Sequence, residues 1–86
     1  MIDEILTERQ KTHGDFRDHA DVTQRIKMVM CCSVKWGTLT TSQRESLEMV
    51  AHKIGRILAG NPNHQDHWAD IAGYAQLVAN QLQDRQ

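Results

Sequence analysis

Residues 43–58 read QRESLEMVAHKIGRIL, and the apolar side chains of this stretch decide the fold. They recur every three or four positions, which places them on one continuous stripe of a helix: Leu47, Val50, Ala51, Ile54, Ile57 and Leu58. Two residue pairs fit the capping-box pattern ahead of the stripe, Ser42 with Glu45 and Thr40 with Gln43. A glycine and a proline shortly after the stripe end the helix.

Three further segments have helical spacing: a short one from Ile2 to about Lys11, one over about 16–32, and one over about 65–83. Between the first two stand Gly14, which can adopt the positive φ of a helix end, and Asp15, which can cap the next helix. The third segment and the QRESLEMVAHKIGRIL helix are joined by a short loop, so we expect these two helices to pack antiparallel.

These patterns predict a single all-α domain over residues 1–86, a compact bundle of three long helices plus a short N-terminal helix. No segment shows the apolar–polar alternation of a strand. A chain of 86 residues hides only about 60–65% of its unfolded surface when it folds. We therefore expect a homo-oligomer, in which a partner subunit completes the core.

Composition narrows the possible functions. Ten Lys and Arg side chains against eleven Asp and Glu leave a net charge of −1, so bulk nucleic-acid binding is disfavoured. No stretch approaches the roughly 20 apolar residues of a membrane span, and the acidic N-terminus does not resemble a signal peptide. The adjacent Cys31 and Cys32 are poorly placed for a disulfide with each other and fit a reducing compartment. We therefore expect a cytoplasmic protein.

The first candidate site is acidic. Glu45 and Glu48 project from one side of their helix, and antiparallel packing can bring Asp70 across from them. Three carboxylates suit Mg²⁺, so this ion is a possible cofactor. The glutamates lie opposite the apolar stripe, and a second surface is needed to close such a site. Solvated acids near a helix N-terminus explain the same pattern.

The second candidate site is basic. His52, Lys53 and Arg56 follow on the same helix, and Lys and Arg side chains bind phosphate oxygens. His13 can add a second edge if its loop folds over the site. Three aromatic side chains can stack on a base, although anchoring the core is an equally ordinary role for them: Trp36, Trp68 and Tyr74.

The pattern Glu45-x-x-Glu48, followed much later by His67-x-x-Asp70, resembles the acidic signature of the MazG-like all-α nucleoside triphosphate pyrophosphohydrolases. In that group two glutamates and a later Glu-x-x-Asp hold Mg²⁺, whereas here His67 stands in place of the third acid. This departure puts hydrolysis in doubt.

The chain as a whole is similar to small, largely bacteriophage-encoded proteins. The similarity lies in residues 13–16 (HGDF), 43–58 and 68–75 (WADIAGYA). It implies a viral protein that acts in the host cytoplasm.

Two functions therefore stand side by side as hypotheses. The first is binding of a phosphorylated nucleotide or nucleotide-derived signal, as in a phage counter-defence protein that sequesters a host messenger. Its expected ligand-binding residues are Lys53, Arg56, His52, His13, Tyr74 and Trp68. The second is a Mg²⁺-dependent MazG-like pyrophosphohydrolase with three metal ligands: Glu45, Glu48 and Asp70. The sequence identifies no catalytic residue beyond these ligands.

Overall fold

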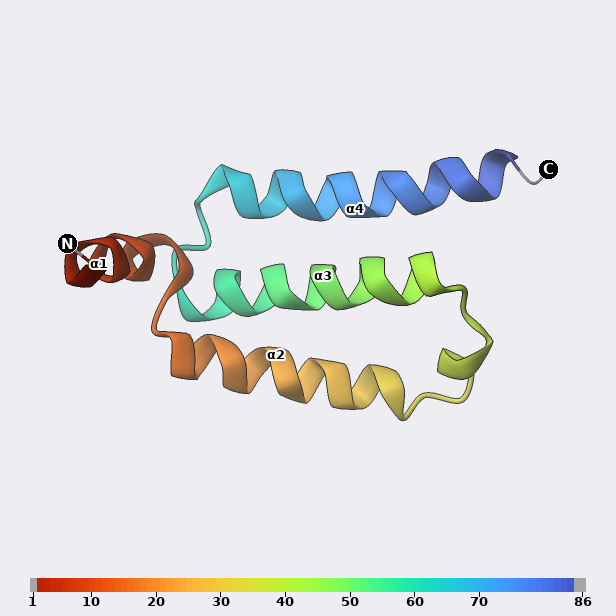
Figure 1. The fold of residues 1–86 in the computed structure, drawn as a ribbon, viewed down its shortest axis with the longest axis horizontal. Coiled ribbons are helices and arrows are strands. Elements are labelled where there is room, and N and C mark those ends of the chain that lie inside the picture. The colour runs from red at the N-terminus through yellow and green to blue at the C-terminus, as the bar shows by residue number, and fades with distance from the viewer. Residues whose placement is uncertain (1, 85–86) are drawn as a thin grey trace.

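The computed structural model describes residues 2–84 and is built from helices (Figure 1). The elements in chain order are α1 (Ile2–His13), α2 (Phe16–Cys31), the 3₁₀ turn η1 (Trp36–Thr38), α3 (Thr41–Ala59) and α4 (Gln65–Asp84). No strand occurs in the described residues, so the all-α prediction is confirmed. The four α-helices have 12, 16, 19 and 20 residues, which does not match the predicted division into three long helices and a short one.

Local signals in the sequence set the ends of the helices. The Asp15 carboxylate accepts a hydrogen bond from the Arg17 backbone N–H and caps α2. Thr40 and Gln43 form the capping box of α3, each side chain accepting a backbone N–H from the other residue, so the pairing of Ser42 with Glu45 is not the one used. Both caps satisfy backbone donors that a helix start leaves without intrahelical partners.

Helices α2, α3 and α4 lie side by side, and α3 occupies the middle (Figure 1). Consecutive helices of this layer run in opposite directions, as predicted for α3 and α4. Helix α1 lies at the end of the layer where α3 finishes, and none of its residues is buried. No helix in the part of the chain described is long and apolar enough to cross a membrane.

Two glycines allow the chain to cross itself where α1 meets the end of α3. Gly14 has φ +81°, as predicted, and packs against the backbone of Ala59. A Cβ atom on Gly60 would lie 2.5 Å from the Thr12 carbonyl oxygen. The Asn61 N–H donates to the same Thr12 oxygen at 3.0 Å. This crossing fixes α1 to the layer through backbone contacts.

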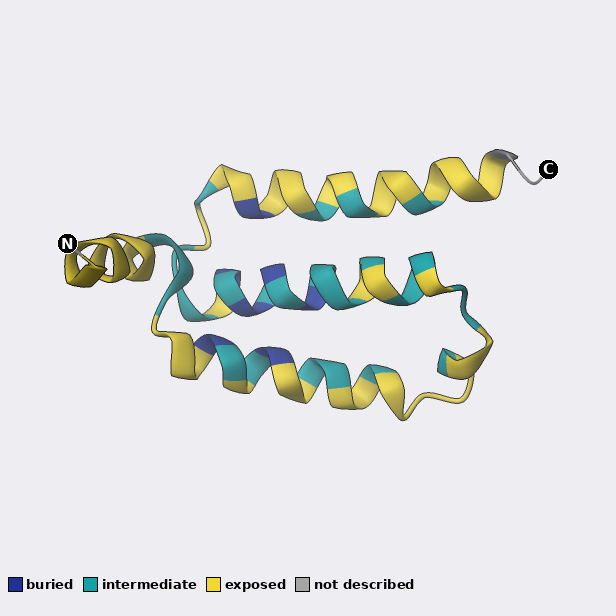
Figure 2. Ribbon diagram, in the orientation of Figure 1, coloured by how far each residue is buried: buried dark blue, intermediate teal, exposed yellow. Residues whose placement is uncertain are grey.

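Very little of the apolar surface is buried. Among the described residues only two apolar side chains, Ala51 and Ile57, are buried, whereas the buried polar and charged residues are His19, Thr23, Lys53 and His67 (Figure 2). The radius of gyration is 14.8 Å, against about 12 Å for a compact domain of this length. The chain by itself is an open layer of helices rather than the compact bundle that the sequence suggested.

Candidate functional site

Four of the predicted ligand-binding residues lie in a polar cluster where α1 and α4 meet α3: His13, His52, Lys53 and Arg56. Its centre is His67, which is 1% exposed and whose Nε2 donates to the Thr12 carbonyl oxygen at 3.0 Å. The centroid of the His67 ring lies 5.0 Å from the centroid of the His13 ring and 4.8 Å from that of the His64 ring. His67 therefore links α4 to the end of α1. It does not stand beside Glu45 and Glu48 in place of a third metal ligand.

Lys53 is the second link between helices in this cluster. Its ammonium lies 2.7 Å from the Asp70 carboxylate, and its side chain is almost entirely buried. The hydrogen bond from Lys53 lowers the pKa of Asp70, because it stabilises the ionised carboxylate. Both groups are thus engaged in joining α3 to α4.

Removing only one partner of this pair should reveal its structural role. Asp70→Asn leaves the buried Lys53 charge without its counter-charge, so we expect the melting temperature to fall by several degrees. Lys53→Met removes the buried charge and keeps an apolar side chain of similar length, so the fall should be smaller. Thermal unfolding followed by circular dichroism measures both. Equal losses in the two variants would contradict this asymmetry.

The predicted basic residues His13 and His52 lie close to Arg56. The pKa of His13 and the pKa of His52 are each lowered to about 4, first by burial and then by the positive charge of Arg56. His19 also has a lowered pKa because of burial, and its Nε2 donates to the His52 carbonyl oxygen at 3.1 Å. Arg56 Nε is buried and has no hydrogen-bond partner in the described part of the chain. The structure therefore brings His13, His52, Lys53 and Arg56 together, with both histidines uncharged at neutral pH.

The two predicted aromatic contacts lie outside this cluster. Trp68 is exposed, and its indole N–H donates to the Pro62 carbonyl oxygen at 2.8 Å. Tyr74 lines a hollow between α3 and α4 together with Glu45 and Leu77. Its carbonyl oxygen accepts the Ser46 hydroxyl at 2.9 Å, which holds the two helices together.

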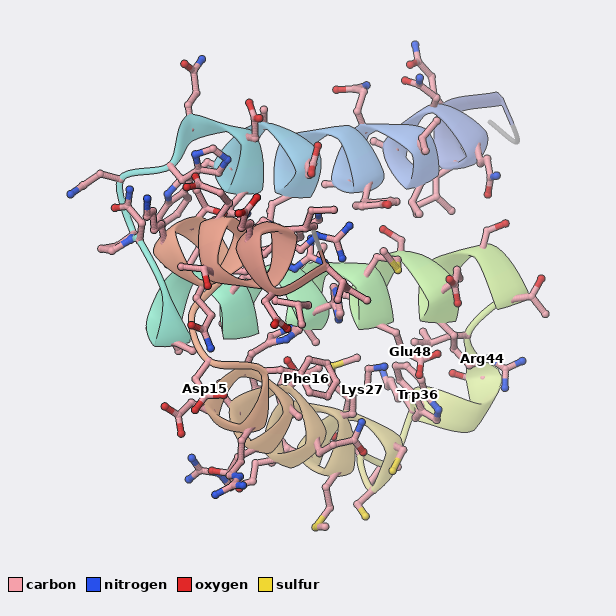
Figure 3. The ribbon with its side chains drawn as sticks, turned by 60° about the vertical axis from the view of Figure 1, so that its left-hand side comes forward. Asp15, Phe16, Lys27, Trp36, Arg44 and Glu48 are labelled. Carbon is pink, nitrogen blue, oxygen red and sulfur yellow. The ribbon has the colours of Figure 1, made fainter. Side chains whose placement is uncertain are left out.

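A larger cavity, of about 730 Å³, opens between α2, η1 and α3, and we call it the α2–α3 cleft (Figure 3). It is lined by Gln24, Lys27, Met28, Cys31, Trp36, Thr41, Arg44, Glu45 and Glu48. Figure 3 shows Lys27, Trp36, Arg44 and Glu48 gathered in this region. Trp36 is half-buried and forms an aromatic wall.

The charged groups of the cleft are free to interact with a ligand. The side chains of Lys27, Arg44, Glu45 and Glu48 make no hydrogen bond or ion pair with any described residue, although two cations and two anions line one cavity. This differs from the polar cluster, where Lys53, His19 and His67 use their polar atoms inside the protein.

The predicted three-carboxylate site is not formed within one chain. Glu45 and Glu48 line the cleft toward α2, whereas Asp70 belongs to α4 and is paired with Lys53. Within residues 2–84 no group of three or more His, Cys, Asp or Glu side chains could hold a metal ion. The carboxylates were expected to meet because α3 and α4 are antiparallel, but α3 turns Glu48 and Lys53 toward different neighbours. These residues do not fit a Mg²⁺ site, and we derive no step through one.

The sequence did not lead us to assign two charged residues of the cleft, Lys27 and Arg44, to a candidate site. A signal was present on α3, because Arg44, Glu48, His52 and Arg56 follow one another at intervals of four and share a side of the helix. Nothing in the sequence places Lys27 of α2 beside that side, since this depends on how the two helices pack.

Fold and cleft define the class: a small all-helical protein whose open cleft carries unpaired charges of both signs and an aromatic wall. Residues 2–82 match the family described as Domain of unknown function (DUF6378), and the chain belongs to this family. No curated protein and no solved structure matches the chain. The resemblances to phage proteins and to pyrophosphohydrolases stay predictions from the sequence.

Proposed function

We propose that this protein binds a phosphorylated nucleotide in the α2–α3 cleft. The observation that carries the proposal is the pair of unpaired cations, Lys27 and Arg44, lining one cavity with Trp36. The cavity, of about 730 Å³, lies within the range of about 300–1,000 Å³ found for small-molecule sites.

Each group in the cleft matches a part of such a ligand. The Trp36 ring can stack on a base, Arg44 can bind two phosphate oxygens at once, and Lys27 adds a mobile positive charge. Glu45 and Glu48 repel phosphate, so they suit hydrogen-bond donors of the base or the sugar. His52 and Arg56 lie one and two turns beyond Glu48 on α3, and the Arg56 guanidinium extends the positive field along the helix.

Titration with a panel of nucleotides tests the proposal. The panel contains nucleoside mono- and triphosphates, and cyclic nucleotides because the phage resemblance predicts a host messenger. Calorimetry gives the Kd, and quenching of tryptophan fluorescence reports stacking. Quenching should persist in Trp68→Phe and disappear in Trp36→Phe. No binding by any member of the panel would overturn the proposal.

A matched pair of variants on α2 tests the cation. Lys27→Gln should weaken binding about ten-fold or more, because a charge-assisted hydrogen bond contributes roughly 1.5–3 kcal/mol. Arg25→Gln makes the same charge change two positions earlier on α2, at a residue that does not line the cleft and is paired with Asp21. This control should stay within two-fold of the parent. Equal weakening by both changes would indicate a general effect of net charge.

The same samples separate binding from hydrolysis. Binding predicts that the intact nucleotide is recovered after the protein is denatured in the presence of Mg²⁺. Release of pyrophosphate that Glu48→Gln abolishes would instead support the pyrophosphohydrolase that the acidic pattern resembles.

The proposal includes a homo-oligomeric state. The described chain buries only Ala51 and Ile57 of its apolar side chains, and such a small apolar core is insufficient for a stable small domain. Association of copies supplies the missing burial.

A further inference from the structure

We infer that a second copy of this chain packs on one apolar face of the helical layer, formed by α3 and α4. We call this surface the α3–α4 apolar face. It is defined by Leu39, Leu47, Val50, Leu58, Ala75, Val78 and Leu82. The inference concerns a surface outside the α2–α3 cleft and does not depend on the proposed ligand.

The face is both hollowed and exposed. A groove of about 330 Å³ runs between α3 and α4 and is lined by Leu39, Leu47, Val50, Ala75 and Val78, with Gln43 and Ser46 as its polar members. On α3 the row continues from Leu47 to Leu58, eleven positions or three turns later, and these side chains are 44% and 67% exposed. On α4 it continues from Val78 to Leu82, one turn later, which is 43% exposed.

The exposed area matches what a dimer would cover. The chain has 6442 Å² of accessible surface, against about 5200 Å² for a compact monomer of the same mass. The excess of about 1,200 Å² exceeds the roughly 800 Å² that each partner contributes to an interface of standard size. The chain therefore exposes more surface than a compact monomer does, and the excess is large enough to form a dimer interface of standard size.

Within the chain, no described element covers this face. A layer of helices buries its apolar side against a second layer, and the remaining helix, α1, lies at the end of the layer with no buried residue. A second copy fits for a further reason. Two-fold symmetry brings a surface against itself, so a groove without charged lining residues meets its copy without like-charge repulsion.

Sedimentation velocity and light scattering between about 1 and 100 µM test the inference. The parent chain should approach about twice its 9.9 kDa mass. Leu47→Glu and Leu58→Glu should each return the mass to that of one chain at 100 µM, while circular dichroism verifies that helices remain. A parent chain that stays monomeric at about 100 µM would overturn the inference.

Leu77→Glu is the matched control. Leu77 is an exposed leucine like Leu47 and Leu58, but it belongs to α4 and lines the hollow with Tyr74 instead of the groove. This variant should keep the dimer mass. Dissociation by Leu77→Glu with no effect of Leu47→Glu and Leu58→Glu would also overturn the assignment of the face. Nucleotide titration of the monomeric variants shows independently whether the cleft binds its ligand.

Discussion

Replacing Gly14 by alanine is expected to lower the free energy of unfolding by about 2–5 kcal/mol, the sum of a left-handed backbone penalty and overpacking. Gly14 has φ +81°, a conformation that L side chains rarely adopt. A Cβ atom there would also overlap the Ala59 carbonyl, which is backbone and cannot rotate away. Relief requires α1 to separate from the end of α3, and this would also break the Asn61–Thr12 hydrogen bond.

Gly73→Ala provides the matched comparison. A Cβ atom on Gly73 meets nothing within 4 Å, and the residue lies inside α4. Alanine there should stabilise the chain by about 1 kcal/mol, the difference in helix propensity. Urea unfolding at one fixed protein concentration measures both variants. A Gly14→Ala chain as stable as the parent would show that the backbone crossing contributes nothing to stability.

The glycines of this chain show which features of the fold can be predicted from the sequence and which cannot. Helical spacing located all four helices, and Gly14 with Asp15 correctly marked the break between α1 and α2. Gly55 and Gly73 could not be told apart, because both stand inside helices. Only the packing distinguishes them: a Cβ on Gly55 would lie 2.7 Å from the His19 ring, whereas Gly73 faces open space.

The candidate site was predictable only along single helices. Periodicity correctly grouped His52 and Arg56, which share one side of α3. It could not show that Lys53 is buried against Asp70, or that His67 is an interior link to Thr12. These pairings depend on the rotation of α3 and α4 about their own axes, which the apolar stripe constrains loosely because few of its side chains are buried. Lys27 could not be assigned to a candidate site for the same reason.

Acidification from pH 7 to pH 4 is expected to lower the melting temperature by at least about 5–10 °C, because the folded state binds fewer protons than the unfolded state. The pKa values of His13 and His52 are about 4 in the folded chain, against 6.5 when free. Both histidines are therefore neutral in the folded state where the unfolded chain is already protonated. Stability is full above pH 6.5 and is lost as the pH falls toward 4.

Melting curves between pH 4 and pH 8, at constant ionic strength and protein concentration, measure this slope. The double variant His13→Gln, His52→Gln removes two of the titrating groups and should reduce the slope of the profile between pH 6.5 and 4. His19, whose pKa is also lowered by burial, accounts for the slope that remains. Asp70 does not produce this slope, because its pKa is lowered from 3.8 and its protonation falls below that window. A parent chain with a flat profile over this range would mean that protons reach both rings in the folded state. A double variant as acid-sensitive as the parent would place the responsible groups elsewhere in the polar cluster.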